Sequence, residues 1–240
     1  MCNPKVKSTF LSLYAQKKIT ASSRAVSELY RMERMALNKV NSKKDSMVSC
    51  NIRSLNKNIQ DLLMSTQGKA AKVICLQETW LQPTEANLNS LDKAVWNQRN
   101  ICIGRGKGIS TIYKKEFDCK RAVKNEKFQM MKIESEKEQI INIYRSYEAD
   151  DICFIEQLVA MITNEKQTII LGDFNLCYQS QRDHPIFNLL HDMNFVQLVA
   201  SLTHIEGRVL DLVFVHETNK NLTVHEKATY FADHDIIDIL

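Results

Sequence analysis

The stretch from Thr168 to Ser180, "TIILGDFNLCYQS", decides how the chain is read. Its apolar start, Thr168 to Leu171, predicts a buried strand, and Gly172 interrupts the run before Asp173 and Asn175 follow. Residues two apart in an extended chain face the same side. A buried strand would therefore end in a carboxylate and a carboxamide on one side, which is typical either of a turn or of a polar site.

Other apolar runs end in the same way. Glu78 comes just after the run "VICL", and Asn51 lies inside the first run, "VSCNIRSL". Tyr144 ends the run that starts at Ile140, while Asp233 and His234 stand next to the last run. Any one of these residues alone suits a cap or a turn, but several at the ends of separate strands indicate a shared polar site.

Asp211 needs a partner if it is buried. It stands between Leu210 and Leu212 in the middle of a predicted strand, Val209–Val215, which contains no basic residue. Burying an unpaired carboxylate is expensive. His234 from a neighbouring strand could be the partner of Asp211, since an Asp–His pair orients and stabilises a charged imidazole. The alternative is that Asp211 is an outward-facing residue at a sheet edge.

Glu78 and Asp173 also suggest a metal site. A hard cation such as Mg²⁺ takes a few carboxylate oxygens and keeps several waters. Acids that meet in one cleft from separate strand ends would supply those oxygens.

The alternation of short apolar runs with polar stretches predicts a mixed α/β sandwich. The expected strands are Met47–Ile52, Val73–Leu76, Ile101–Ile103, Ile109–Tyr113, Phe128–Ile133, Ile140–Tyr144, Thr168–Leu171, Val209–Val215, Tyr230–Phe231 and Ile236–Leu240. The expected helices are one in the arm from Ser22 to Val40, then Lys57–Met64, Asp150–Asn164 and Pro185–Met193. Asp183 is the expected cap of the last helix.

Composition sets the broad class. The 240 residues, 44% hydrophobic and 25% charged, suit a globular protein of one large or two small domains. Seven scattered cysteines predict reduced thiols in a nuclear or cytoplasmic protein that is not secreted. No apolar run is long enough to cross a membrane. "GRGKG", 104–108, has neither phosphate-loop nor dinucleotide spacing, so no small-molecule organic cofactor is expected.

Charge is distributed unevenly along the chain. Residues 1–45 hold ten basic and three acidic residues, a net +7, which leaves 22 basic and 25 acidic residues, a net −3, for the rest. A basic arm, helical in part, suggests a polyanionic partner. The alternative is a solvated, partly disordered tail. The polar stretch 41–46 places the domain boundary, which gives an arm over 1–45 and a domain over 46–240.

Five motifs in order carry a family resemblance: an early "CNIRSLNKN", then "LQET", "GDFN", "LDLVF" and "ADH". From about Met47 to Leu240 the chain resembles the endonuclease/exonuclease/phosphatase superfamily, and most of all the endonuclease domains of LINE-type retrotransposons and related mobile elements. "GRGKGISTIY" and "THIEGRVLDLVF" are similar to that branch. The resemblance implies a four-layered, DNase I-like sandwich of two β-sheets with flanking helices, and phosphoester hydrolysis that depends on Mg²⁺ or Mn²⁺.

The resemblance also implies roles for the catalytic residues. Asp173 would position or deprotonate the attacking water, and Asn175 would steady the phosphate. Asp211 would orient His234, which would contact the scissile phosphate in its charged form. Tyr144 would hydrogen-bond a phosphate oxygen.

Metal and nucleic-acid contacts follow from the same resemblance. Glu78 would bind the metal, assisted by Asn51, with Asp233 beside it. The residues expected to touch nucleic acid are Arg53, Arg105, Lys107 and His204. His204 is equally well read as a structural loop residue.

These roles predict a metal-dependent endonuclease that nicks DNA. Two alternatives stay open: a phosphatase of inositol phosphates or lipid head groups from the same superfamily, and a catalytically silent relic that only binds nucleic acid or a partner. Abasic-site endonucleases of the superfamily carry an aspartate where this chain has Arg53. We therefore expect cleavage of ordinary duplex DNA with little preference for abasic sites.

Overall fold

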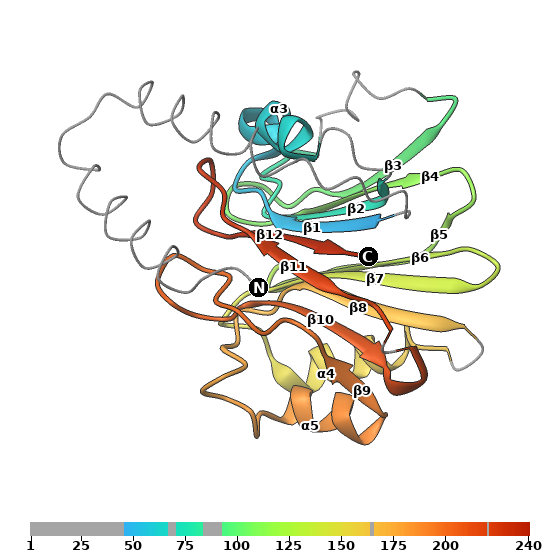
Figure 1. Cartoon of the computed structure of the whole chain (residues 1–240), viewed down its shortest axis with the longest axis vertical. Helices are drawn as coiled ribbons and strands as arrows, with labels where there is room; N and C mark the ends of the chain where they lie inside the picture. The colour runs from blue at the N-terminus through green and yellow to red at the C-terminus, as the bar shows by residue number, and fades with distance from the viewer. Residues whose placement is uncertain (1–45, 67–70, 84–92, 164–165, 220) are drawn as a thin grey trace. The chain divides into compact units, whose positions relative to one another are not determined.

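The computed structural model describes residues 46–66, 71–83, 93–163, 166–219 and 221–240 (Figure 1). The basic arm over 1–45 and the helix expected within it lie outside the described residues, so both, and the boundary at residue 46, stay predictions. None of the described helices is both long enough and apolar enough to cross a bilayer.

The first of two six-stranded sheets is built from both ends of the domain. Its order is β11-β12-β1-β2-β4-β3, and within it β1 and β2 run parallel while the other pairs are antiparallel. Its strands are β1 (Ser46–Asn51), β2 (Ala71–Gln77), β3 (Trp96–Ile101), β4 (Ile109–Lys114), β11 (Val224–Lys227) and β12 (Ile236–Ile239).

The second sheet comes from the middle of the chain. Its order is β5-β6-β7-β8-β10-β9, and β7 and β8 are its parallel pair. Its strands are β5 (Asp118–Lys124), β6 (Phe128–Glu134), β7 (Glu138–Arg145), β8 (Gln167–Asp173), β9 (Phe195–Gln197) and β10 (Asp211–His216).

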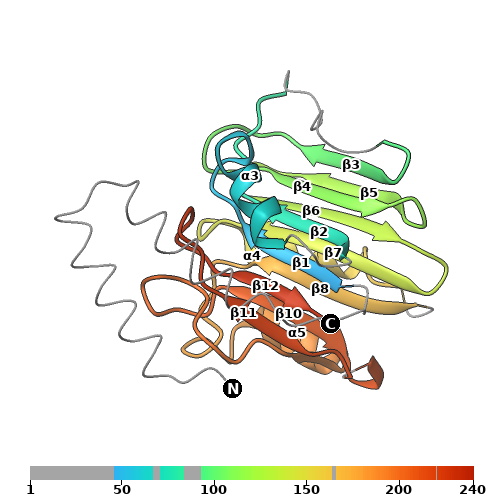
Figure 2. The same cartoon turned by 45° about the horizontal axis from the view of Figure 1, so that its top comes forward.

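Helices cover the outer faces of the two sheets. Figures 1 and 2 show α3 (Leu55–Thr66) over the first sheet, and α4 (Asp151–Val159) and α5 (Pro185–Asp192) over the second. A short 3₁₀ turn, Glu217–Asn219, follows β10. The predicted four-layered α/β sandwich is confirmed.

Strand β1 shows how alternation builds these layers. Val48 and Cys50 pack with Ile59 and Leu62 of α3 in one apolar cluster. Met47 faces the other way and joins the large cluster that also contains residues of the second sheet. Side chains with period two thus serve the helix on one face and the opposing sheet on the other.

The register brings the polar strand ends to one edge of the sandwich. Asp173 ends β8, pairing with Tyr144 near the end of β7 and with Asp211 at the start of β10. Asn51 ends β1 in the opposing sheet and pairs with Gln77, which directly precedes Glu78. Ends of parallel strands from both sheets therefore deliver the candidate site residues together.

Some strand predictions were wrong, and some strands were not predicted. Only Ile101 of the expected strand Ile101–Ile103 is in β3, which lies upstream, and Tyr230–Phe231 is not a strand. The strands β5, β9 and β11 were not predicted. β5, "DCKRAVK", is an edge strand with alternating exposed positions and no apolar run to reveal it.

Two local predictions also need correction. The strand that holds Asp211 begins at that residue, so the carboxylate lies at a strand end and not in the middle. The cap of α5 is His184, whose side chain accepts from the Ile186 amide, and not Asp183. Pro185 does occupy the first turn, as its fixed φ favours.

Gly172 does not interrupt the strand as its sequence context suggested. It lies within β8, paired with Leu212 and Ile143, at a φ of +134°. A Cβ placed there would stand 2.0 Å from the Ile143 carbonyl oxygen. Only glycine lets β7 and β8 approach so closely just before Asp173.

We expect Gly172→Ala to destabilise the fold by about 3 kcal/mol or more, through strained backbone and a backbone clash. Gly207→Ala is the matched control, since φ is +78° there but nothing lies within 4 Å of the added Cβ; it should cost roughly 1 kcal/mol. Urea unfolding measures both. Equal losses in the two variants would contradict the close approach of β7 and β8.

Candidate active site

The Asn51 carboxamide joins two candidate catalytic acids and lies beside a third group, His234. Its Nδ2 donates to Glu78 Oε1 over 3.1 Å and to Asp173 Oδ2 over 2.9 Å. His234 Nε2 lies 3.4 Å from the same nitrogen. Asn51 is fully buried, and its own Oδ1 accepts from the Arg53 amide at 3.3 Å. One side chain from the first sheet thus fixes an acid from each sheet.

The pairing expected for Asp211 is present. Its Oδ2 lies 2.8 Å from His234 Nδ1, and both side chains are buried. The Thr203 hydroxyl oxygen accepts from the backbone amides of Leu210 and Asp211, at 3.0 and 3.1 Å, which fixes the start of β10. The alternative prediction, that Asp211 is an outward-facing residue at a sheet edge, is wrong, because Asp211 is only 1% exposed.

These contacts decide the charge of His234. Burial alone would lower its pKa, but the neighbouring carboxylates of Asp211, Asp173 and Asp233 outweigh burial and raise the pKa to about 10. Burial raises the pKa of Asp173 to about 7, with Asp211 and Glu78 adding to the rise and His234 opposing it. The site therefore holds a charged imidazole beside a carboxyl that titrates near neutral pH.

The turn after β8 differs from the extended geometry expected for it. Asn175 has a φ of +49°, so the chain leaves the strand at once. Its backbone N–H donates to Asp173 Oδ1 at 2.9 Å. The side-chain Nδ2 of Asn175 donates to the Arg145 carbonyl at 2.8 Å and to Asp173 Oδ2 at 3.2 Å. Asn175 therefore holds Asp173 in place, and its contact with a phosphate stays a prediction.

Trp80 is a site residue that the sequence analysis missed. Its indole Nε1 donates to Glu78 Oε2 over 3.2 Å, so both oxygens of Glu78 accept from fixed donors. The Arg105 guanidinium carbon lies 5.7 Å from the Trp80 ring centroid, a cation–π distance. The signal in the sequence is only a tryptophan two residues after the acid, which does not by itself indicate this contact.

The glycine-rich segment 104–108 docks against the same turn. The Trp80 amide donates to the Lys107 carbonyl at 3.0 Å, and the Tyr144 hydroxyl donates to the Gly106 carbonyl at 3.0 Å. The Tyr144 proton is thus already used, so the expected bond to a phosphate oxygen would require exchange of this partner. Arg105 is exposed beside the site and Lys107 is half-buried.

Asp233 forms a second polar cluster with basic partners. Its Oδ2 lies 2.6 Å from Arg53 Nη1 and 3.6 Å from His204 Nε2. Although burial would raise its pKa, His204, His234 and Arg53 lower it to about 2. The ring of His204 also packs against His234, with centroids 4.6 Å apart. Arg53 and His204 therefore lie beside Asp233, and their contact with nucleic acid stays a prediction.

Two groups of side chains could hold an ion among the described residues: Asp173, Asp211 and His234, and His204, Asp233 and His234. Neither group includes Glu78 or Asn51, and both depend on His234. A protonated imidazole has no lone pair to give a metal.

Oxygen donors fit a hard divalent ion better. Glu78 is held by Asn51 and Trp80, and Asp233 Oδ1 is a buried oxygen that accepts no hydrogen bond from the described residues. A carboxylate, a carboxamide and this orphaned oxygen are the ligand types that Mg²⁺ and Mn²⁺ prefer. The predicted set of Glu78, Asn51 and Asp233 thus suits such an ion chemically.

We expect the His234 imidazole of the metal-free protein to remain protonated at pH 8, and Asp211→Asn to lower its pKa by roughly a unit or more. Because the folded pKa of about 10 exceeds the ordinary 6.5, the charged imidazole stabilises the fold fully below pH 6.5. That contribution is lost as the pH rises towards 10. A pH titration by NMR measures the pKa, and a value near 6.5 in the parent would contradict the pairing.

Comparison with known families gives one match. Residues 139–238 match a family model described as endonuclease-reverse transcriptase. This range contains Tyr144, Asp173, Asn175, Asp211 and His234. No curated protein matches the sequence.

Solved structures share the fold at low identity. An AP endonuclease from Archaeoglobus fulgidus is 12% identical, with a TM-score of 0.65 over 82% of this chain and 99% of that one. The endonuclease domain of TRAS1, a telomere-specific non-LTR retrotransposon, is 12% identical, with a TM-score of 0.62 over 81% and 96%. The 3′ phosphatase NExo from Neisseria, bound to a product DNA hairpin, is 14% identical, with a TM-score of 0.61 over 82% and 99%. The family match thus covers residues 139–238, and the solved structures show that this chain shares their fold.

Proposed function

We propose that the protein is a divalent-metal-dependent phosphodiester hydrolase that nicks DNA and derives from a mobile element. The observation that carries the proposal is the Asn51 carboxamide, which holds Glu78 and Asp173 within hydrogen-bond distance of one nitrogen and lies 3.4 Å from His234. Two acids and a charged imidazole around one buried amide are the groups that phosphoester hydrolysis needs.

Each group has a chemical task on an anionic phosphodiester. The Asp173 carboxyl, with a pKa near 7, can accept a proton from the attacking water at neutral pH. His234 can donate a hydrogen bond to a phosphate oxygen as charge develops there, since Asp211 keeps the imidazole charged and oriented. Asn175 fixes the rotamer of Asp173.

Glu78, Asn51 and Asp233 would hold the Mg²⁺ or Mn²⁺. Such an ion, when bound, neutralises phosphate charge and polarises the phosphoryl oxygen. Trp80 keeps the Glu78 carboxylate in one orientation. Arg53, Arg105, Lys107 and His204 would contact the DNA backbone, which positions the duplex without reading its sequence.

The comparisons support the choice of DNA and of origin. The family model is described as endonuclease-reverse transcriptase. TRAS1 is a retrotransposon whose endonuclease domain shares this fold, and NExo was solved with a product DNA hairpin. A phosphatase of inositol phosphates or lipids has no such support here.

We expect the purified protein to nick supercoiled plasmid in Mg²⁺ and to be inactive in EDTA. His234→Gln and Asp173→Asn should each lower the nicking rate by about 10³-fold, because each removes transition-state stabilisation or the base. His225→Gln, at an exposed histidine on β11, is the matched control and should nick as the parent does. Gel separation of nicked and supercoiled plasmid gives the rates.

Three outcomes separate the alternatives. Nicking by His234→Gln at the parental rate would show that the cleavage comes from elsewhere. Release of inorganic phosphate from an inositol polyphosphate, without nicking, would favour the phosphatase. Binding of DNA without cleavage in any divalent metal would favour the silent relic.

Trp80→Phe should raise the Mg²⁺ concentration for half-maximal nicking by about tenfold, because the indole N–H no longer fixes Glu78. His225→Gln is again the control, since His225 is an exposed residue of β11. The measurement is the nicking rate over a series of Mg²⁺ concentrations. An unchanged requirement in Trp80→Phe would remove this positioning role.

Arg53 bears on the kind of DNA that is cut. Its guanidinium is paired with Asp233 through one nitrogen and is 47% exposed, so its other N–H groups remain able to bind the phosphates of an intact backbone. We expect matched duplexes with and without one abasic analogue to be cleaved at similar rates. A preference for the abasic duplex of about 100-fold or more, about 2.7 kcal/mol in barrier, would make the protein a repair enzyme instead.

A further inference from the structure

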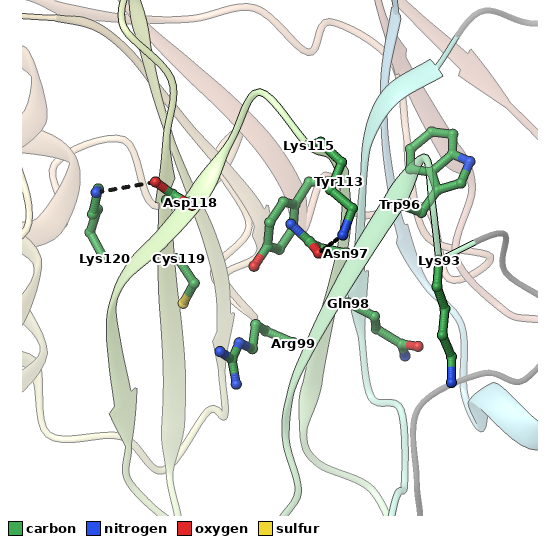
Figure 3. Close-up of a pocket in the computed structure, with 10 residues that line it drawn as sticks. All are labelled: Lys93, Trp96, Asn97, Gln98, Arg99, Tyr113, Lys115, Asp118, Cys119 and Lys120. Carbon is green, nitrogen blue, oxygen red and sulfur yellow. Dashed lines mark hydrogen bonds and ion pairs between the residues drawn. The ribbon is translucent and has the colours of Figure 1, made fainter.

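A basic hollow lies along the outermost strand of each sheet. Its volume is about 500 Å³, and it opens between β3, the edge strand of the first sheet, and β5, the edge strand of the second (Figure 3). Four basic side chains line it, Lys93, Arg99, Lys115 and Lys120, against one carboxylate, Asp118. The lining therefore carries a net charge of +3.

The acid does little to neutralise this charge. Asp118 lies 3.5 Å from Lys120 Nζ, and its side chain is 76% exposed. A long ion pair in water contributes little. Within the part of the chain that the structure describes, neither Arg99 nor Lys93 forms an ion pair with a carboxylate. Like charges in one hollow repel each other, so the hollow attracts a multiply charged anion.

Tyr113 gives the hollow a fixed polar floor. Its ring is only 3% exposed and packs in the large cluster between the sheets. Burial raises the pKa of its hydroxyl, although the nearby Arg99 guanidinium opposes the rise. The hydroxyl therefore keeps its proton and can donate it to a ligand in a hydrogen bond. Asn97 likewise accepts from Lys115 Nζ at 2.7 Å through Oδ1, which leaves its amide hydrogens as donors.

The donors and the size point to phosphate. Guanidinium and ammonium groups match phosphate oxygens, and arginine does so with two parallel hydrogen bonds. A volume of about 500 Å³ lies in the range of small-molecule sites and exceeds that of one phosphate group. We propose that this hollow binds the phosphates of a nucleotide-sized ligand, supplied as a free nucleotide or as one unit of a nucleic-acid strand.

The hollow is separate from the candidate active site. Ile101, at the end of β3, pairs with Ile109, whose other neighbour is Gln77, next to Glu78. Trp96 at the start of the same six-residue strand lies about 16 Å further from that edge at the ordinary strand rise. The proposal shares no residue with the proposed nuclease site and does not rest on it.

The test is calorimetric titration of the full-length protein with ATP as the probe, at low salt in EDTA. The parent should bind one ATP saturably, and Arg99→Gln combined with Lys120→Gln should weaken binding by about tenfold or more. Lys124→Gln is the matched control, because Lys124 is an exposed lysine on the same strand outside the hollow. No saturable binding to the parent, or equal affinity in the double variant, overturns the proposal.

Two further variants locate the ligand. Tyr113→Phe keeps the buried ring but removes the hydroxyl, so it should weaken ATP binding several-fold without unfolding the protein. His234→Ala should leave ATP affinity unchanged, and loss of binding in that variant would place the anion in the candidate active site and overturn the proposal.

Competition distinguishes the two sources of phosphate. A short oligothymidylate that displaces ATP from the parent, but fails to bind the double variant, assigns the hollow to a nucleic-acid strand. ATP binding that the oligonucleotide leaves unchanged assigns it to a free nucleotide. Both patterns uphold a phosphate site in the hollow.

Discussion

The buried Asn51 carboxamide is the constraint on which the candidate site depends. It ends β1 in the first sheet and donates to Glu78, directly after β2 of that sheet, and to Asp173 of the second sheet. A buried donor without acceptors costs about 1–3 kcal/mol, so the amide and the two acids are stable only together. The geometry of the site therefore depends on how the two sheets pack, because a shift of either sheet separates these groups.

Backbone strain gathers at the same edge. Among the described residues other than glycine, six have positive φ, and five of them, Arg53, Ser54, Glu78, Trp80 and Asn175, follow the ends of β1, β2 and β8. Each such residue costs on the order of 1–3 kcal/mol and persists only where its surroundings hold it. Hydrogen bonds from the 104–108 segment and within the β8 turn hold Trp80 and Asn175. The chain thereby turns polar side chains inward directly after buried strands.

The sequence predicted the parts of this arrangement that depend on composition and order. Apolar runs predicted the central strands, and the burial of Asp211 between leucines predicted its pairing with His234, found at 2.8 Å. Hydrogen-bond partners that depend on tertiary placement could not be predicted from the sequence. No local pattern indicates that Trp80 donates to Glu78 or that Tyr144 donates to a backbone carbonyl in the glycine-rich segment. Edge strands such as β5 could not be predicted either, because they lack the apolar run that reveals buried strands.

We propose that the polar strand ends shared by the two sheets hold a divalent ion through oxygen donors, with Glu78 foremost. Calorimetric titration of Mn²⁺ into the metal-free protein tests it most directly, with Glu78→Gln compared with Glu116→Gln, a change at an exposed acid in the β4–β5 turn. We expect one site in the parent and in Glu116→Gln, and affinity weakened by about tenfold or more in Glu78→Gln, because the amide replaces a charged ligand. Equal Mn²⁺ affinity in all three proteins would contradict it.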